Sequence, residues 1–298
     1  MGSRFEITVV AQNDSEANQF INLAVKEISR IEQLISSWDS KSQTSEINHN
    51  AGEKAVRVDS ELFQLIERAI AISKLTDGAF DISYASMDKV WVFDGSMTTM
   101  PSEEEISASV DKVGYENIIL DHNNQTVYLK HKGMKIGFGA IGKGYAADKA
   151  KALLISNGVT SGIINASGDL SAWGVQPNGY SWKVAITNPM DKNKIYAMLP
   201  IKNSAVVTSG NYEKMVSFNG KQYTHIIDPR TGYPSTGVVS VTIFAPKAEL
   251  ADALATSVFV MGKSIGLDRI NQMPNIECII IDDNGTIFKS DNIKIHTQ

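Results

Sequence analysis

The sequence predicts an α+β fold in which mainly antiparallel strands pack with helices. Short strand-like runs with alternating or continuous apolar residues recur along the chain, and amphipathic helical segments separate them. Of the 298 residues, 43% are hydrophobic and 20% are charged, which is the balance of a globular protein with a substantial core. The sequence contains no internal repeat or linker-like segment, so one domain over residues 1–298 is expected.

The first third of the chain predicts a strand and two helices. A strand is expected at Arg4–Ala11, and an amphipathic helix at about Asp14–Leu34. The stretch Ser36–Gly52 is rich in serine, asparagine and aspartate and is expected to be a loop. A second amphipathic helix is predicted at about Asp59–Thr76, with Asp77-Gly78 as its C-terminal cap.

Helix starts and turn residues define the later elements. Ser102 followed by three glutamates indicates a helix N-terminus, and Asn123-Asn124 lies between two strand-like runs as a hairpin turn. A glycine-rich passage, Gly137–Gly144, opens a helix that ends near Ile155. The second half is expected to contain four strands and two helices: Gly162–Asn165, Trp182–Ile186, Val238–Ala245, Glu277–Asp282, Ala248–Met261 and Lys263–Gln272.

The composition excludes several classes of protein. A net charge of −5 without a basic stripe argues against nucleic-acid binding. Cys278 is the single cysteine, so neither an intrachain disulfide framework nor a cysteine-based zinc cluster is expected. The longest apolar runs, such as Val258–Met261, are too short to span a bilayer. No signal peptide is visible at the start, which fits either a cytosolic protein or one whose leader was removed.

The glycine-rich segment Gly137–Asp148 is the first candidate site. Glycines at a helix start let backbone N–H groups approach phosphate oxygens, and Lys143 adds a cation there. The segment matches neither the dinucleotide fingerprint nor the P-loop, so a phosphate site and a tight structural turn both remain open. In the segment Asn165–Gly174, Asp169 follows a strand, where a simple strand-ending turn is equally compatible with the pattern.

Two further segments carry chemistry. Asp252 and Thr256 lie four residues apart on one face of an apolar helix, which suits oxygen ligands of Mg²⁺ but also a helix-end aspartate with a back-bonding threonine. His225 precedes the rigid turn formed by residues 228–234 and is the best candidate for a general base. The four other histidines lie in polar or terminal surroundings, where no catalytic role is expected.

Taken together, these segments resemble the ApbE family, the FAD:protein FMN transferases, over nearly the whole chain. The resemblance rests on the ordered motifs MGSRF, SSWDSKSQTSEIN, TDGAFDIS, GKGYAAD, NASGD, TSGNYEK, HIIDPRTGYP and DALATSVFVMG. It implies an α+β fold of the T-fold type with an FAD cleft between two closely joined parts. It also implies Mg²⁺-dependent transfer of FMN from FAD to a threonine or serine hydroxyl of an acceptor protein, with release of AMP.

The resemblance assigns roles to individual residues. His225 would be the catalytic base. The metal would be held by Asp252, Thr256 and the backbone carbonyl of Ala140. The FAD contacts that the resemblance implies are Met1, Trp38 (stacking on the flavin nucleotide), Ala79, Phe80, Asp81 (adenosine portion), Lys143, Asp169 and Ile227.

Three positions depart from the family pattern. Gly137 stands where many members have an aspartate, so one hydrogen-bond acceptor for FAD is missing or supplied elsewhere. Ser167 replaces the first glycine of the usual Gly-Gly-Asp, which is a mild change if its φ is negative. Ala255 stands where some members have another metal-binding aspartate, which puts a second metal ion in doubt.

The main alternative is an FAD pyrophosphatase that releases FMN and AMP with the same residues, and the bulky Trp38 favours transfer by limiting access of water. A flavin-binding carrier without catalysis would have no use for a base and a metal site, and a flavin oxidoreductase would need a nicotinamide fingerprint that the sequence lacks.

The resemblance further implies an extracytoplasmic protein, periplasmic or tethered to the membrane through a removed leader. Its acceptors would be redox-pump subunits and related electron-transfer proteins with an Asp-x-x-Thr/Ser motif.

Overall fold

The computed structural model describes residues 2–187, 195–210, 215–218 and 221–293, and within it the chain forms two units. The first unit comprises Met1–Ile31, Ile141–Gly210 and Gly237–Gln298, and the second comprises Glu32–Ala140 and Asn211–Thr236. Each unit is thus assembled from segments that are far apart in the sequence. The expectation of one domain over 1–298 stays a prediction.

A seven-stranded antiparallel sheet forms the framework of the first unit. Its strand order is β1-β5-β6-β9-β12-β13-β14, and β7 and β8 form a separate two-stranded sheet. The bounds of these strands are β1 Phe5–Val9, β5 Gly162–Ala166, β6 Asp169–Trp173, β7 Trp182–Thr187, β8 Ile195–Ile201, β9 Ala205–Gly210, β12 Val238–Ala245, β13 Glu277–Asp282 and β14 Ile287–Lys289. The helices of this unit are α5 (Gly142–Ser156) and α6 (Ala248–Asn271), and α1 (Asp14–Ile35) begins in it.

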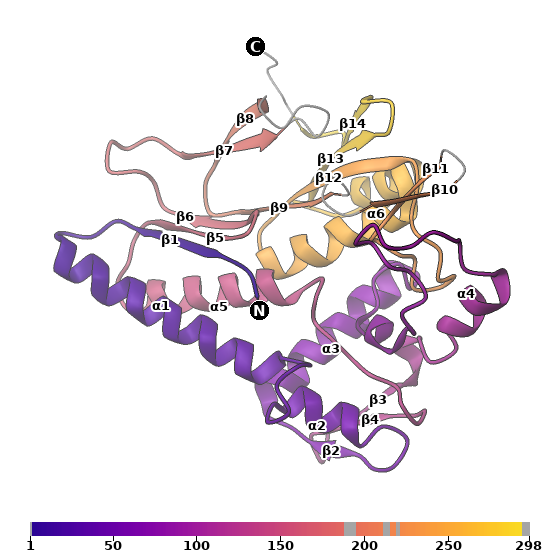
Figure 1. The fold of residues 1–298 in the computed structure, drawn as a ribbon. Coiled ribbons are helices and arrows are strands. Elements are labelled where there is room, and N and C mark those ends of the chain that lie inside the picture. Colours follow the sequence, from indigo (N-terminus) through magenta and orange to yellow (C-terminus); the bar gives the residue numbers. More distant parts are fainter. Residues whose placement is uncertain (1, 188–194, 211–214, 219–220, 294–298) are drawn as a thin grey trace. The chain divides into compact units, whose positions relative to one another are not determined.

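Alternation along β6 separates the two faces of this sheet. Ala172 packs with residues of β7 and β8 in one apolar cluster, and Leu170 lies against the same cluster. Because successive side chains of a strand point to opposite faces, Asp169 and Ser171 share the other face, against which α5 packs. Figure 1 shows the β7–β8 pair and α5 on opposite sides of the sheet. The polar residues of β6 therefore face the helices.

Helix α6 is interrupted where the sequence predicts two separate helices. Gly262 adopts φ 77° and ψ 172°, a conformation outside the helical region that glycine tolerates best. The predicted break between Met261 and Lys263 is confirmed. By length and composition α6 could cross a membrane, contrary to the expectation from the short apolar runs, but half of its apolar window is buried in the first unit, as in the core helix of a globular domain.

The second unit combines short helices with two small sheets. Strands β2, β3 and β4 form a three-stranded antiparallel sheet in the order β2-β4-β3, and β10 pairs with β11. The bounds of its elements are α2 Gln43–His49, β2 Val56–Arg57, α3 Ser60–Leu75, the 3₁₀ turn η1 Ile82–Ser86, α4 Glu103–Ser109, η2 Tyr115–Asn117, β3 Ile118–Asp121, β4 Thr126–Leu129, β10 Met215–Phe218 and β11 Lys221–Thr224.

The predicted loop at Ser36–Gly52 is wrong over seven of its residues, Gln43–His49, because the helix α2 forms there. Ser42 has an extended conformation, and its Oγ accepts the Ser45 N–H at 2.9 Å as an N-cap. Thr44 and Ile47 are buried, so tertiary packing stabilises a helix in a segment whose composition favours a loop. Serine is common in loops, but the same side chain also caps helices, and Ser42 starts one here.

The other predicted elements of this unit are confirmed. Ser102 and Glu105 form the capping box of α4, and the hairpin between β3 and β4 turns at the expected asparagines. Helix α3 ends as expected at Asp77-Gly78, where the Gly78 N–H donates to the Ser73 carbonyl at 2.9 Å. Asp77 itself adopts a positive φ of 49°, so an aspartate and a glycine share this cap.

Helices α5 and α6 approach each other very closely at Gly144. A Cβ atom at this position would lie 2.2 Å from the carbonyl oxygen of Ala248, far inside van der Waals contact. Gly144 is therefore required for helix packing, which answers in part whether the glycine-rich segment has a structural role. Gly139, by contrast, has no atom within 4 Å of such a Cβ.

Replacing Gly144 by alanine is expected to destabilise the protein by about 1–3 kcal/mol, because α5 and α6 must move apart to admit the methyl group. The free energy of unfolding from urea titration measures the effect. Gly139→Ala, where the Cβ meets open space, is the matched control and should change stability by less than about 1 kcal/mol. Equal stability of the two variants would contradict the role given to Gly144.

Candidate functional site

A buried cluster of charged side chains occupies the helix side of the first unit. Lys143 lies at the start of α5, Asp169 begins β6 and Asp252 lies in the second turn of α6. The Lys143 ammonium Nζ is 2.6 Å from Oδ2 of Asp169, whose side chain is 1% exposed. Two carboxyl groups and one amine thus meet from three segments of the chain. The first and last of these segments are about 110 residues apart in sequence.

Asp252 is the most strongly perturbed acid of the cluster. It is 3% exposed, and its Oδ2 accepts the N–H of Gly144 at 3.2 Å. Burial, followed by repulsion from Asp169, raises the pKa of Asp252 to about 8, and Lys143 offsets only part of this shift. In this environment the carboxyl group favours a proton or another cation.

Lys143 and Asp169 form an ion pair inside the same environment. Burial disfavours the charge of Lys143, but attraction by Asp252 and Asp169 outweighs it and raises the pKa of the ammonium. Burial also raises the pKa of Asp169, against the effect of Lys143. Among the described residues, Oδ2 of Asp169 has no hydrogen-bond partner beyond this ion pair. With all three groups ionised, one negative charge remains to be balanced.

A hydroxyl group of α6 lies near Asp252 in sequence and pairs with a hydroxyl group of β9. Thr256, one turn after Asp252 on α6, has its Oγ1 3.4 Å from the Ser209 hydroxyl of β9. The predicted metal ligands Asp252 and Thr256 therefore share one helix face, as their spacing indicates. Among the described residues, no three His, Cys, Asp or Glu side chains gather as a metal cluster, so a metal here would have few protein ligands.

An aromatic cavity of about 640 Å³ is the main feature of the second unit. His225 and Ile227 line it together with Trp38, and the remaining aromatic walls are Tyr84, Trp91 and Phe93. Its volume lies in the range of small-molecule sites. Trp38 is 87% exposed, and the Lys89 ammonium lies 5.8 Å from the centroid of its indole ring.

A second, more polar cavity of about 780 Å³ shares Ser37, Trp38, Asn48 and Lys135 with the first.

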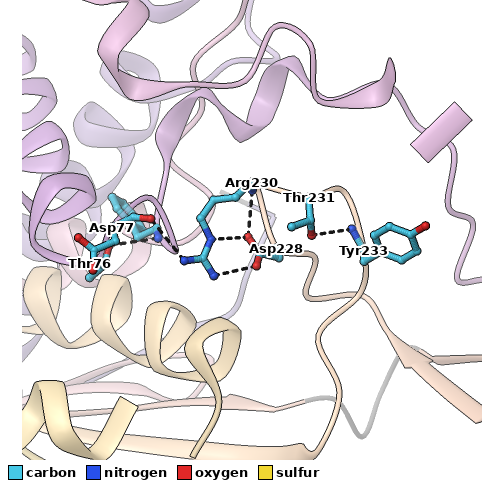
Figure 2. A network of polar contacts seen from close by, with 7 residues as sticks. Thr76, Asp77, Asp228, Arg230, Thr231 and Tyr233 are labelled. Carbon is cyan, nitrogen blue, oxygen red and sulfur yellow. Dashed lines mark hydrogen bonds and ion pairs between the residues drawn. The ribbon is translucent and has the colours of Figure 1, made fainter. Parts of the chain in front are cut away.

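The turn after His225 is rigidly constructed, as predicted. The Arg230 guanidinium donates two side-chain hydrogen bonds of 2.8 Å to the Asp228 carboxylate, and its Nη1 donates to the Asp77 carbonyl at 3.4 Å (Figure 2). The Gly232 N–H donates to the Asp228 carbonyl at 2.9 Å, and Trp91 Nε1 donates to the Gly232 carbonyl at 2.9 Å. The turn thus holds Ile227 and the cavity wall at Trp91 in fixed positions.

Comparison with known proteins identifies the family of the chain. A family model described as the ApbE family matches residues 1–280. The chain belongs to the ApbE family. The resemblance deduced from the sequence motifs is confirmed.

Individual relatives agree with this assignment. A protein of Klebsiella pneumoniae named FAD:protein FMN transferase is 31% identical over 292 residues, which cover 97% of this chain and 89% of that protein. A protein of Treponema pallidum with the same name is 31% identical over 265 residues, covering 84% of this chain and 73% of that protein. The predicted assignment to the transferases, as an enzyme, is confirmed.

A solved structure supports the ApbE fold directly. The crystal structure of the ApbE protein from Thermotoga maritima matches with a TM-score of 0.87 and 34% sequence identity, covering 97% of this chain and 94% of that one. The predicted α+β fold of the ApbE type is confirmed.

The predicted site residues of this ApbE chain fall into two groups. Lys143, Asp169, Asp252 and Thr256 lie together in the first unit, whereas Trp38, His225 and Ile227 line one cavity of the second unit. Ala140 is the last residue of the second unit before the chain enters α5, and Met1 lies outside the described residues. The individual roles given to all of these residues stay predictions.

Ala79, Phe80 and Asp81 form a structural corner of the second unit. Phe80 is 2% exposed, and Ala79 is equally buried. The Asp81 carboxylate accepts the Ser83 N–H, the Ser83 hydroxyl and the Tyr115 N–H at 2.6–2.8 Å, while burial raises its pKa. Their predicted contact with adenosine stays a prediction, and the side chain of Asp81 already has three hydrogen-bond donors.

The structure gives physical reasons for the departures from the ApbE pattern. A Cβ at Gly137 would lie 3.0 Å from the Ala85 methyl group, so a larger residue would be crowded there. Ser167 has a φ of 54°, not the negative value on which a mild effect depended, and costs about 1–2 kcal/mol relative to an unstrained residue. Its hydroxyl donates to the Arg4 carbonyl at 3.0 Å, which offsets part of the cost. Ala255 is fully buried.

Sequence reasoning missed several residues of these sites. Asp148 and Ser209 belong to the motifs GKGYAAD and TSGNYEK, whose patterns indicate no separate role for them. Tyr84 lines the aromatic cavity from the 3₁₀ turn η1, and Trp91 and Phe93 line it from an irregular segment, so no periodic pattern in the sequence indicates them. Residues 211–214 of the TSGNYEK motif lie outside the described residues.

The raised pKa of Asp252 predicts that the metal-free protein loses stability as pH rises. An ordinary aspartate has a pKa of about 3.9, so between pH 4 and about 8 the folded state binds more protons at Asp252 than the unfolded state does. The free energy of unfolding should therefore fall by up to about 1.4 kcal/mol per pH unit in this window. Urea titrations at pH 6 and pH 8 with a chelator measure the slope.

Asp252→Asn is the control for this slope. It keeps an acceptor for the Gly144 N–H but cannot ionise, so the slope should become clearly shallower. Asp169, Asp148 and Asp81, whose pKa values burial also raises, account for the slope that remains. An unchanged slope in this variant would assign the titration to another group.

Proposed function

We propose that the chain is an FAD:protein FMN transferase, which moves the FMN half of FAD to a threonine or serine hydroxyl of an acceptor protein and releases AMP. Membership of the ApbE family and the names of its relatives support this activity. The observation that carries the proposal is the buried Lys143–Asp169–Asp252 cluster at the start of α5, a place suited to an anionic pyrophosphate and its counter-cation.

The donor set of the first unit fits Mg²⁺. This ion takes carboxylate and hydroxyl oxygens, and it retains several waters or phosphate oxygens besides one or two protein carboxylates. Asp252 and Thr256 supply such oxygens on one helix face, and because burial and Asp169 raise the pKa of Asp252 to about 8, a cation would stabilise its ionised form. We include the Ala140 carbonyl as a third ligand on the family resemblance alone. Bound Mg²⁺ would neutralise negative charge that develops on the pyrophosphate.

Lys143 contributes a positive charge that needs no metal. Its raised pKa keeps it protonated at neutral pH, so its ammonium can bind a phosphate oxygen while Asp169 holds the side chain in place. The N–H groups at the start of α5 point along the helix axis and favour an anion at the same end. Lys143 and Asp169 are therefore proposed to bind the dinucleotide.

The second unit supplies aromatic surface and a base. Trp38, with an exposed indole, and the buried Ile227 suit contact with a flat apolar ring such as the flavin. The His225 imidazole is proposed to take the proton of the acceptor hydroxyl as its oxygen attacks the FMN phosphorus in line. The bond between this phosphorus and the bridging oxygen breaks, and AMP departs with that oxygen.

Replacing His225 by alanine should lower the rate of FMN transfer by about 10²–10⁴-fold, because the acceptor hydroxyl loses its general base. FAD binding, followed by quenching of flavin fluorescence, should be largely retained. His122→Ala, at an exposed histidine beside Glu67, is a matched control that should leave transfer unchanged. Transfer at the wild-type rate in the His225 variant would remove this residue from the mechanism.

Hydrolysis of FAD to FMN and AMP is the second candidate reaction, since the same groups could activate water. Trp38 is an exposed residue in the lining of the aromatic cavity. Its indole ring favours transfer over hydrolysis, because it can cover the flavin and limit access of water. Incubation with FAD and Mg²⁺ but without acceptor should release little AMP, as measured by chromatography. AMP release as fast as transfer would instead favour the pyrophosphatase, and absence of either reaction would favour a flavin carrier.

The acceptor and the cellular location are proposals from the resemblance alone. We propose acceptors with an Asp-x-x-Thr/Ser motif among redox-pump subunits and related electron-transfer proteins, and a location outside the cytoplasm, with a membrane tether only if a removed leader carried it. Mass spectrometry of co-expressed candidate acceptors, searching for added FMN, tests the first of these directly.

A further inference from the structure

Asp148 is a carboxylate of the first unit to which the proposed function gives no role. It lies on α5, four residues after Gly144, and is partly buried. Its Oδ1 accepts the hydroxyl hydrogen of Ser171, at 3.1 Å, and its Oδ2 accepts the backbone N–H of Glu249, at 3.0 Å. Asp148 thus connects α5 with strand β6 and with the first turn of α6.

The start of α6 needs such a partner. The first N–H groups of a helix have no acceptor within the helix, and an N-cap side chain usually supplies one. Lys247, the N-cap of α6, makes no side-chain cap hydrogen bond. Asp148 supplies the acceptor from a different helix, and its negative charge suits the positive end of the α6 dipole.

The two helices cap each other. Asp148 of α5 accepts an N–H at the start of α6, while Asp252 of α6 accepts the Gly144 N–H at the start of α5. Residues four apart share a helix face, so Gly144 and Asp148 face α6 just as Ala248 and Asp252 face α5. The close approach of Gly144 to the Ala248 carbonyl leaves little freedom for α6 to rotate or slide.

Asp148 also reaches the strand that carries Asp169. Ser171 and Asp169 are two residues apart on β6 and therefore project from the same face of the sheet. The hydrogen bond from Ser171 to Asp148 holds α5, with Lys143, against this strand. One carboxylate thereby orders all three elements that bear the charged cluster.

We propose that Asp148 is a positioning residue that fixes the Asp252 carboxylate by capping α6, and thereby sets the affinity of the site for a divalent cation. The inference rests on the proposed function, since cation binding at Asp252 is part of it. Groups that orient a metal ligand without touching the metal typically change metal affinity by about 10–100-fold when they are removed.

The test compares three variants of the full chain in Mn²⁺ titrations followed by electron paramagnetic resonance, with saturating FAD present. Asp148→Ala removes both acceptors and should weaken Mn²⁺ binding by about 10-fold. Asp148→Asn keeps an acceptor for Glu249 and a donor for Ser171, so its Kd should stay within about threefold of the wild type. Ser102→Ala removes a cap of the same kind from α4 in the second unit and should leave the Kd unchanged.

Thermal unfolding separates positioning from general stability. Asp148→Ala and Ser102→Ala should both lower Tm, but only the former should raise the Kd for Mn²⁺. If Asp148→Ala does not fold, Asp148→Ser is used in its place, because its single, shorter hydroxyl cannot reach both partners and should also weaken binding. An unchanged Kd in Asp148→Ala, or in Asp148→Ser where that variant replaces it, with a wild type that binds Mn²⁺, would overturn the positioning role alone. A wild type that binds no Mn²⁺ with FAD would overturn the proposed metal site and this role with it.

Discussion

The close approach of α5 and α6 is the constraint on which the first unit depends. With glycine at position 144, the backbones of the two helices come close enough for the Gly144 N–H to reach Asp252. The same approach brings the start of α6 within reach of Asp148. A larger residue at position 144 would separate both pairs at once, so helix packing and the placement of the charged cluster cannot be changed independently.

Electrostatics explains both the energetic cost of the charged cluster and its proposed use as a cation site. Two buried carboxyl groups lie beside one partly exposed ammonium group, so one negative charge is left unbalanced when all three groups are ionised. Burial and repulsion from Asp169 raise the pKa of Asp252 to about 8, which favours the neutral carboxyl group in the protein alone. Under the proposed function, a divalent cation would replace that proton, and the stability of the unit would then be coupled to cation binding.

In the second unit, the lining of the aromatic cavity comes mostly from loops, so other contacts must hold these loops rigid. Its aromatic cavity is lined by residues from segments around Trp38, Trp91 and His225 that have little regular structure between them. Hydrogen bonds from side chains take the place of the backbone hydrogen bonds that strands would make. Trp91 donates to the Gly232 carbonyl, and Arg230 donates to both Asp228 and the Asp77 carbonyl. Such bonds are effective where both partners are buried or where a guanidinium fork fits a carboxylate.

Local patterns in the sequence determined most helices and strands, the capping box at Ser102, the break at Gly262 and the family, because these features depend on neighbouring residues or on ordered motifs. They also paired Asp252 with Thr256 through helical spacing. Composition misled at Ser36–Gly52, where burial of Ile47 stabilises a helix. Only the tertiary structure decided that Lys143, Asp169 and Asp252 meet, that Gly144 serves packing, and that Asp148 caps α6, because each depends on contacts between segments distant in sequence and on the burial that those contacts create.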